Sequence, residues 1–481
     1  MITYNDYLMV KDKQSTEELL SFVHSVISNH KNSDAFKLAD IAEDYDKRKN
    51  RTIVNYQKLL YTASGEGVPD IYGANYKLAS GFFQRFNIQG VQYLLGNGIT
   101  WGDPATADRL GKDFEKKVQT LASYAKVGGV SFGFFNLDHL EVFKLTEFAP
   151  LFDEEDGSLK AGVRFWQIES NKPLRATFYE MDGYTEMVWG RRELVGGTVK
   201  VNGAEILREK RPYKIKVNIS DIDGTEIYDG ENYPSFPIVP LWANKDHQSE
   251  IVGLREQIDC YDLIKSGYAN TIDEASFIYW TIQNAGGMDD IDLQEFVDHM
   301  RRVRAAVVSD EGASAESHSI EAPYQGREML LQKLRDDLYD DAMALDVKSI
   351  ASGAKTATEI EASYEPLNNK TDDFEYHVTQ FLEGILSLAG IEDEPTFSRS
   401  VIVNNTEKIQ TVLQASQYLE DDYVTTKLLT LLGDGDMAEE MLRQMDADGI
   451  DRLTEKTEET EPREEPQEED QGEPNEEEQW H

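Results

Sequence analysis

The chain has 481 residues, enough for two to four domains and a sizeable buried core. Its net charge of −42, from 48 Lys and Arg against 90 Asp and Glu, argues against a conventional nucleic-acid binder, which needs basic side chains to neutralise phosphates. One cysteine excludes an internal disulfide framework, and no apolar run approaches the roughly 20 residues that span a bilayer. With no signal peptide visible, we expect a soluble protein made inside the cell.

Roughly the first 245 residues are expected to form an α+β body. Apolar residues recur at helical spacing in four early segments, at 15–30, 34–49, 72–99 and 114–127. The pattern then changes, and β-branched and aromatic residues predict strands over 130–148, 161–170, 174–190, 198–208 and 212–228. The pair Asp182-Gly183 between two of these segments predicts a hairpin turn.

Two long amphipathic helices that flank a compact insert follow this body. They are expected over 249–277 and 324–347, and the first would be on the order of 40 Å long at about 1.5 Å per residue. Their apolar stripes consist of Ile251, Leu254, Ile258, Leu331, Leu334 and Leu338. Because both helices border the same insert, we expect them to run antiparallel, side by side.

The insert itself, 278–323, is predicted to be a small α/β unit. It contains a strand at 277–283, a helix beginning near Asp289, a strand at 305–308 and then a polar loop up to Pro323. Its densest basic patch consists of Arg301, Arg302 and Arg304. This patch is either the exposed side of a short helix or a contact surface for another protein.

After the second long helix, small residues over 348–357 predict a break. Thr358 and Glu361 have the spacing of a capping box that opens a helix over 358–390, and Pro366 should kink or interrupt that helix. Further helices are expected near 406–419, 421–432 and 436–446. Residues 454–481 hold 13 acidic and two basic residues and almost no apolar ones, so this tail is expected to be disordered.

Two motifs suggest catalysis and fail on their context. Gly129-Val-Ser131-Phe-Gly133 matches the G-x-S-x-G pattern of serine hydrolases, but that motif needs a strand before the serine and a helix after it. Here the order is reversed, which favours a glycine-rich turn between helix and strand. Gly353-Ala-Lys355-Thr356 matches only the end of a phosphate-binding loop, with no leading strand.

Acidic clusters offer possible metal ligands without a convincing pattern. A calcium-loop spacing runs from Gln444 to Glu455, but Gln replaces the usual first Asp. Two clusters of carboxylates are most simply interpreted as a helix start and as a solvated helix face. The first consists of Asp289, Asp290 and Asp292, and the second of Asp336, Asp337, Asp340 and Asp341. The histidines show no metal-binding spacing. We therefore predict no cofactor, no metal and no enzymatic activity.

Several segments, taken in order, resemble the portal proteins of tailed double-stranded DNA bacteriophages, in particular siphophages of Gram-positive hosts. They are Asn75-Tyr-Lys-Leu-Ala79, Tyr93-Leu-Leu-Gly-Asn-Gly-Ile99, Pro237-Ile-Val-Pro-Leu241, Glu321-Ala-Pro323 and Ser352-Gly353-Ala354. Each is degenerate alone, and the order holds from about residue 40 to residue 430. The resemblance implies a ring, usually of twelve subunits, at one vertex of the capsid.

The resemblance also implies a division of the chain. The parts would be a wing (1–248), stem helices (249–277 and 324–347), a clip (278–323), a tunnel loop (348–357), a long kinked helix (358–390), a crown (391–453) and the tail (454–481). Tunnel-loop residues facing DNA would be Lys348, Ser349, Ile350, Ala351, Ser352, Gly353, Ala354 and Lys355. Clip contacts would be Trp280, Arg301, Arg302 and Arg304. An ordinary connector between two helices remains the alternative for the loop.

The resemblance further implies partners and a place. The ring would take double-stranded DNA through its channel and contact the large terminase, a head–tail connector, the major capsid protein and scaffolding proteins, in the virion and, during assembly, in the host cytoplasm. The acidic excess would then keep phosphates from binding tightly to the channel wall. The alternatives are another structural or scaffold-like virion protein, and a hydrolase acting through Ser131.

Overall fold

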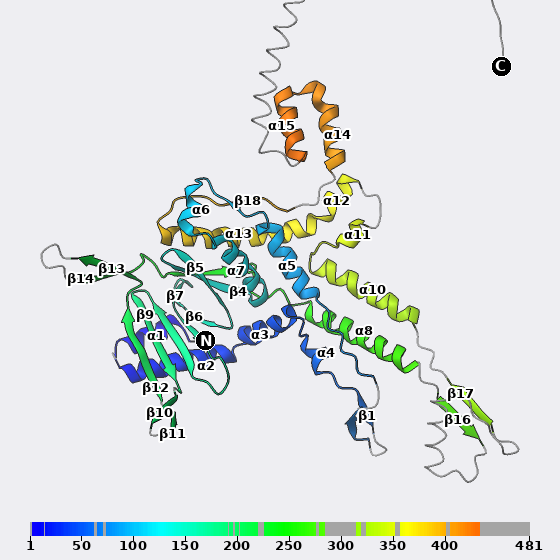
Figure 1. The fold of residues 1–481 in the computed structure, drawn as a ribbon, viewed down its shortest axis with the longest axis horizontal. Coiled ribbons are helices and arrows are strands. Elements are labelled where there is room, and N and C mark those ends of the chain that lie inside the picture. The colour runs from blue at the N-terminus through cyan, green and yellow to red at the C-terminus, as the bar shows by residue number, and fades with distance from the viewer. Residues whose placement is uncertain are drawn as a thin grey trace, which may run out of the picture. The chain divides into compact units, whose positions relative to one another are not determined.

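The computed structural model describes residues 2–13, 15–61, 65–70, 74–190, 192–195, 198–201, 203–219, 226–275, 279–283, 314–318, 324–351, 356–400 and 405–432. They belong to two compact units. One comprises Met1–Ser352 and Ser363–Val401, and the other comprises Gly353–Ala362 and Ile402–His481. The fold mixes helices and antiparallel sheets, as the sequence predicts (Figure 1).

The larger unit contains a five-stranded antiparallel sheet in the order β12-β9-β8-β7-β6. Its strands are β6 (Phe148–Phe152), β7 (Leu159–Trp166), β8 (Leu174–Glu180), β9 (Gly183–Trp189) and β12 (Ala204–Arg211). Helices α1 (Tyr4–Lys11) and α2 (Thr16–Asn32) bury their apolar sides against it, with Val23, Phe178 and Met187 in the core. The predicted hairpin turn at Asp182-Gly183 is confirmed, since Glu180 pairs with Gly183.

A second sheet, in the order β15-β4-β5, forms the centre of this unit. Its strands are β4 (Val130–Asn136), β5 (His139–Lys144) and β15 (Ile238–Trp242). Helix α7 (Phe114–Gly128) packs on β4 and β5, and helix α13 (Glu365–Ala389) packs on β15 and β4. Gly133 of β4 admits this packing, because a Cβ there would lie 2.6 Å from the ring of Phe381 on α13.

Several further helices and two-stranded pairs complete the body of this unit. Its helices are α3 (Asp34–Asp46), α4 (Arg51–Asn55), α5 (Phe82–Leu95), α6 (Ala105–Leu110) and α11 (Val347–Ala351). Its two-stranded pairs are β1 (Leu59–Tyr61) with β2 (Gly67–Pro69), β3 (Ile99–Thr100) with β18 (Thr396–Phe397), β10 (Arg192–Val195) with β11 (Thr198–Val201), and β13 (Lys214–Ile219) with β14 (Glu226–Glu231).

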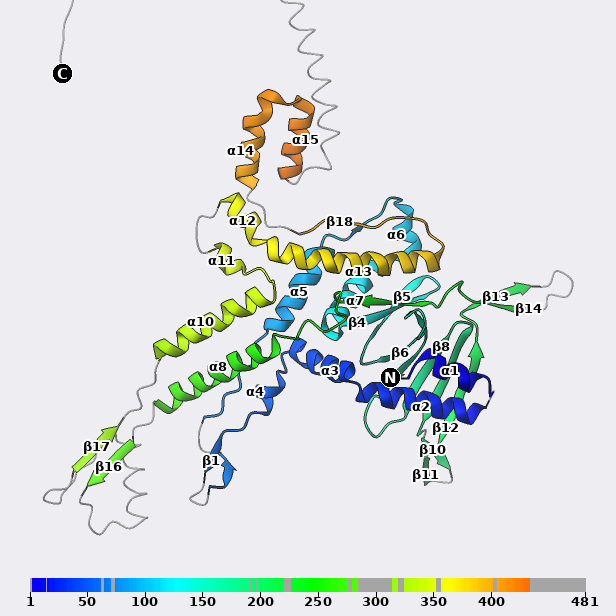
Figure 2. The same cartoon turned by 180° about the vertical axis from the view of Figure 1, so that it is seen from behind.

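The two long helices are present and are shorter than the sequence indicated. Helix α8 spans Arg255–Ala275 and α10 spans Tyr324–Asp341 (Figure 2). The predicted start at 249 was wrong because Gly253 has φ +83, outside the helical region, so a turn precedes Arg255. The predicted end at 347 was wrong because Met343 has φ +50 and stops the second helix.

Two further expectations need correction. Strand β16 (Tyr279–Gln283) lies where a strand was predicted, but it pairs with β17 (Ser314–His318), which was expected to be a polar loop. Backbone pairing needs no apolar pattern, so periodicity does not reveal β17. The capping box before α12 (Ala357–Ser363) uses Thr356 and Glu359, which exchange hydrogen bonds, and not the overlapping Thr358 and Glu361.

The predicted interruption at Pro366 is confirmed, because α12 ends at Ser363 and α13 has this proline in its first turn. In the smaller unit, α14 (Asn405–Ala415) and α15 (Asp421–Leu432) form a helical hairpin joined by the 3-10 turn Ser416–Tyr418. The helix expected at 436–446 and the tail lie outside the described residues. In the part of the chain that the structure describes, no helix is long and apolar enough to cross a membrane.

Candidate assembly site: the paired helices and the segments fixed to them

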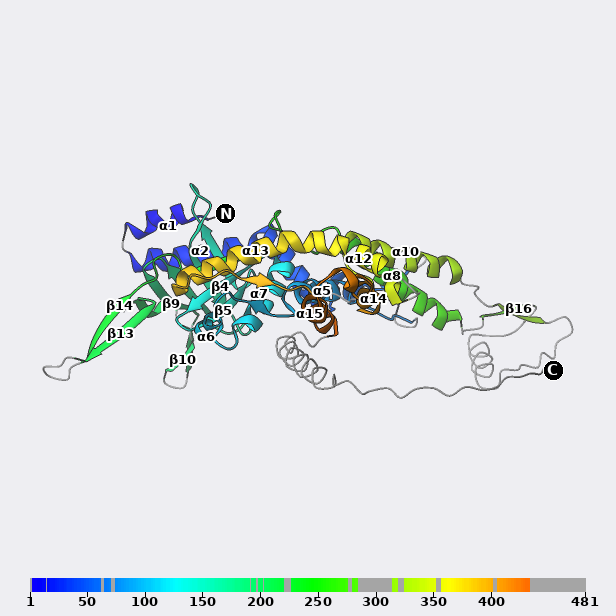
Figure 3. The ribbon, with the colours of Figure 1, turned by 90° about the horizontal axis from the view of Figure 1, so that it is seen from above.

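Helices α8 and α10 run antiparallel and touch along their length. Near one end Gln257 donates to Asp341, and near the other Arg327 donates to Thr271 at 2.8 Å. At the Thr271 end of the pair, the rings of Tyr268 and Tyr324 lie 5.9 Å apart. The antiparallel pairing inferred from the flanked insert is therefore confirmed (Figure 3 shows the pair from above).

The apolar stripes of the pair meet the body at one end only. Ile251, Leu254, Ile258 and Leu338 are buried in a core that includes Phe82 and Phe86 of α5. Leu331 and Leu334, farther along α10, are half-buried. Beyond this core most of α10 is exposed, and Met329 keeps 73% of its surface. The pair is thus anchored at its base, and α10 is largely uncovered along its outer half.

A second, polar stripe on α8 escaped the sequence reasoning. Asp262, Ser266 and Asn270 accept the backbone N–H groups of Ser80, Leu78 and Tyr76 at 2.9, 3.0 and 2.7 Å. The acceptors on α8 are four residues apart, a rise of about 6 Å along the helix, and the N–H donors are two extended residues apart, a rise of about 6.6 Å. The spacing of the acceptors therefore matches the spacing of the donors. Residues 74–81, here called the strap, are held along α8 by these bonds. The only signal in the sequence was the spacing of polar residues at 262, 266 and 270.

The buried end of this ladder has an unusual electrostatic environment. Asp262 is fully buried and also accepts the side-chain amide of Asn50. Burial raises the pKa of its carboxyl group, because the hydrogen bonds offset only part of the lost hydration. One turn earlier, Asp259 accepts the hydroxyl groups of Tyr45 and Thr52 at 2.6 and 2.7 Å. The same face of α8 is therefore fixed to α3 and α4 as well.

A buried ion cluster joins the base of the pair to the body. Glu250 contacts Lys126 of α7 at 2.7 Å and Lys370 of α13 at 2.9 Å. Burial alone would raise the pKa of Glu250, but the two ammonium groups outweigh it and lower the pKa to about 2. For Lys126, burial outweighs the attraction of Glu250 and lowers its pKa. Lys370 also donates to the carbonyl of Ala342, just after α10.

The segment that follows α10 is fixed at two points. The amide of Gln89 on α5 bonds both the N–H and the C=O of Leu345, at 3.0 and 2.9 Å. Both carboxylate oxygens of Asp346 accept from Nη2 of Arg335 at 2.7 Å, and Asp346 also accepts the N–H of Lys348 at 3.1 Å. Because that bond caps a helix start, residues 347–351 form α11, and the expectation of a loop was wrong there.

The predicted tunnel residues are only partly visible. Ser349, Ile350 and Ala351 lie in α11 with Lys348, whose side chain is exposed. Ser352, Gly353, Ala354 and Lys355 lie outside the described residues. Of the predicted clip contacts, Trp280 lies in β16 opposite Ser317, and Arg301, Arg302 and Arg304 lie outside the described residues.

The serine of the hydrolase-like motif is not available for catalysis. Ser131 is fully buried, and its hydroxyl donates to the carbonyl of Leu121 at 2.8 Å. A helix precedes it and a strand contains it, which is the reverse of a nucleophile elbow. Gly129 of the motif is therefore the turn between α7 and β4, and the rest of the motif is the first part of a buried strand.

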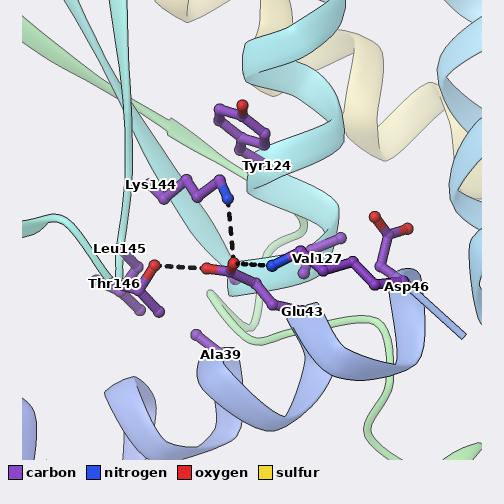
Figure 4. Close-up of a pocket in the computed structure, with 10 residues that line it drawn as sticks. Ala39, Glu43, Asp46, Tyr124, Val127, Lys144, Leu145 and Thr146 are labelled. Atoms are coloured by element: carbon purple, nitrogen blue, oxygen red, sulfur yellow. Dashed lines mark hydrogen bonds and ion pairs between the residues drawn. The ribbon is translucent and has the colours of Figure 1, made fainter. Parts of the chain in front are cut away.

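The pocket drawn in Figure 4 is equally poor as an active site. It has a volume of about 30 Å³, room for roughly one water molecule. Its acidic wall is occupied, because Glu43 bonds Lys47 at 3.0 Å, Lys144 at 3.1 Å and the hydroxyl of Thr146. These contacts outweigh burial and lower the pKa of Glu43. The cluster ties α3 to β5.

The described residues contain no group of three or more His, Cys, Asp or Glu placed to hold a metal ion. On α10, Asp336 accepts from Gln332, and Asp337 pairs with Lys333 at 2.6 Å, as expected of a solvated helix face. The carboxylates at 289–292 and the loop from Gln444 to Glu455 lie outside the described residues.

Comparisons with known proteins point to one family. Residues 179–449 match the family model described as phage portal protein, SPP1 Gp6-like. The chain is 21% identical to the portal protein of Bacillus phage SPP1 over 440 residues, covering 85% of this chain and 83% of the relative. It is 24% identical over 187 residues to the portal protein of Clostridium phage phiCD119, covering 36% of this chain and 41% of the relative, so this match spans less than half of that relative.

Among solved structures, the neck of a native gene transfer agent particle, computed with C12 symmetry, covers 73% of this chain and 90% of its own, at 11% identity and a TM-score of 0.41.

Proposed function

We propose, from the premise that this chain belongs to the SPP1 Gp6-like family of phage portal proteins, that it is the ring subunit of the portal vertex. The family model covers more than half of the chain, so membership of that family is established. A portal protein is a structural component of the virion and not an enzyme. The ring, its DNA channel and its partners are the parts that we propose.

The observation that carries the ring is the state of the helix pair. Its base is buried in the core of its own subunit, while Met329 and Leu330 of α10 and Ile272 of α8 remain exposed along its length. Exposed apolar side chains gathered on one pair of helices favour burial against neighbouring copies. Contacts between unlike faces that close on themselves generate a ring, and we infer twelve subunits from the family.

Within that ring we infer the roles that the family resemblance suggests. Residues 1–248 would be the wing, α8 and α10 the stem, 278–323 the clip and 391–453 the crown. The clip, through Trp280, Arg301, Arg302 and Arg304, would contact the large terminase and later the head–tail connector. Capsid and scaffolding proteins would meet the ring elsewhere, and double-stranded DNA would pass through its channel.

The segment 348–355 is the proposed constriction of the channel. Its lysines, Lys348 and Lys355, would touch phosphates in passing, and two per subunit are too few for tight binding. The test is a double substitution, Lys348→Ala with Lys355→Ala, scored for ring formation and for DNA retention separately. Normal rings that leak packaged DNA support the role, while normal rings with normal retention remove it.

Electron microscopy of the purified protein tests the function itself. End-on views should show a closed ring with an axial hole, and counting subunits gives its symmetry. Light scattering that shows only monomer at micromolar concentration, across salt conditions, would overturn the ring. A filament or an open aggregate would favour the alternative of another structural virion protein.

A further inference from the structure

Helix α8 lies between the strap and α10, so the three form a layered slab. The strap meets α8 at Asp262, Ser266 and Asn270, whereas α10 meets it at Gln257, Tyr268 and Thr271. At about 100° of rotation per residue, these two sets lie on opposite flanks of the helix. Figure 1 shows the same order, with β1 and its neighbours on one side of α8 and α10 on the other.

Both outer faces of this slab carry uncovered apolar side chains. On the strap, Tyr76 is 50% exposed and Leu78 is 37% exposed. The hairpin that leads into the strap exposes Leu59 and Val68 on its two opposite faces. On the other face, Met329 points away from α8, since it lies about half a turn from the α8-facing Arg327 and Leu338. Neither face is covered by the described residues of its own subunit.

The two faces also differ in charge. Lys77 of the strap is exposed, and its ammonium group lies 2.6 Å from the carbonyl of Val54. The outer face of α10 carries Asp336 and Asp340, both exposed, and also exposed Lys333, which pairs with Asp337 at 2.6 Å and leaves the face acidic in sum. Because side chains alternate in an extended segment, Tyr76 and Leu78 lie along one edge of the strap and Lys77 along the other. One flank of the slab therefore presents an apolar edge beside a basic one, and the other flank presents Met329 beside acidic residues. Such a pair fits another copy of itself head to tail.

We propose that the strap of one subunit packs on the outer face of α10 of the next subunit. This inference rests on the proposed ring and names the two faces that close it. Tyr76 and Leu78 pack against Met329, and Lys77 lies near Asp336 and Asp340. The hydrogen-bond ladder on α8 is then what holds the strap rigid enough to act as an interface.

Cysteine crosslinking between two differently labelled chains tests this contact. One chain carries Tyr76→Cys and the other Met329→Cys, both with Cys260→Ser to remove the exposed native thiol. A disulfide needs Cα atoms within about 7 Å. Within one chain the two positions are separated by α8, and packed helix axes alone lie about 8–10 Å apart. Any disulfide therefore joins two subunits.

The expected result is a covalent heterodimer in the mixture and at least a tenfold lower yield in either chain alone. A single chain with both cysteines should give covalent multimers up to the closed ring. Repeating the experiment with Leu78→Cys and with Gln332→Cys covers a shift in register of two residues on the strap or three residues on α10. The control chain carries Ile168→Cys, an apolar site on the five-stranded sheet's β7–β8 connection that is more exposed than either tested position.

Two results would overturn the contact without contradicting the ring. In the first, native mass spectrometry shows rings while no strap–α10 pair crosslinks above the Ile168→Cys control. In the second, Tyr76→Cys of one subunit forms a disulfide with Tyr76→Cys of another. If the parent chain forms no ring at all and no pair crosslinks, both the contact and the proposed function fail.

Discussion

The carboxylate of Asp262 accepts the backbone N–H of Ser80 at 2.9 Å from a fully buried position on α8. This bond couples the helix to a segment 182 residues earlier in the chain. The other carboxylate oxygen of Asp262 accepts a hydrogen bond from the side-chain amide of Asn50. One side chain therefore satisfies two buried donors. Asp262 therefore fixes the end of the strap at Ser80.

Removing the carboxylate of Asp262 should release the strap. We expect Asp262→Ala to lower the free energy of unfolding by about 2 kcal/mol or more, because it strands two buried donors. Ser266→Ala should cost about 1 kcal/mol, since the N–H of Leu78 is only partly buried. Amide exchange at Tyr76, Leu78 and Ser80 measures the release. Glu256→Ala, exposed on the same helix, is the control; equal exchange in all variants would refute the ladder.

The ion cluster at Glu250 should give the protein a pH-dependent anchor. Because the folded pKa of Glu250 lies near 2 and its ordinary value is 4.5, its stabilising contribution is complete above pH 4.5 and is lost as the pH falls toward 2. Glu250→Gln should cost about 3–5 kcal/mol at pH 7, since it leaves Lys126 buried without a counter-charge. Urea unfolding at pH 7 and pH 3 should show this difference shrinking.

The matched control for that measurement is Glu383→Gln, an exposed glutamate on α13. Its stability should follow that of the parent at both pH values. A difference between Glu250→Gln and the parent that is as large at pH 3 as at pH 7 would show that the carboxylate charge is not what anchors the helix pair.

The two leucines predicted to line the stem should respond differently to charge. Leu338 is fully buried, so Leu338→Asp should destabilise the subunit by at least about 3 kcal/mol, through a lost apolar side chain and a buried charge. Leu334 is half-buried, and Leu334→Asp should leave the subunit folded. Thermal unfolding compares both with Gln332→Asp on the exposed side. Equal losses at 334 and 338 would contradict the burial.

Patterns of period two and 3.6 predicted most of the fold. The apolar stripe at Ile251, Leu254 and Ile258 marked a buried helix face. The strands of both sheets lie in or beside the predicted segments except β15, which lies in a proline-rich stretch where no strand was predicted. Helix ends were less predictable, because they depend on single backbone angles. Gly253 and Met343 leave the helical region, and nothing in the apolar pattern registers this.

The site was harder to predict than the fold because its contacts join distant segments through polar atoms. Ser266 and Asn270 are ordinary polar residues of a helix until an extended segment lies beside them. The two hydrogen bonds from Gln89 to Leu345 join residues 256 positions apart. Periodicity registers which face of a helix is apolar, and it cannot register which backbone a polar side chain will meet.

The bridge from Gln89 should set the order of the proposed channel segment. Its amide occupies both hydrogen-bonding groups of Leu345, as a paired strand would, and three residues later Lys348 begins the exposed face of α11. Gln89→Ala removes one acceptor and one donor, so we expect a loss of about 1–3 kcal/mol and faster amide exchange at Leu345 and Lys348. Gln92→Ala, exposed on the same helix, should change neither.

In the Gln89→Ala variant rings should still form, because the buried core of the helix pair is untouched, while DNA retention falls if the segment forms the constriction. Unchanged exchange at Leu345 would show that the bridge does not hold the segment.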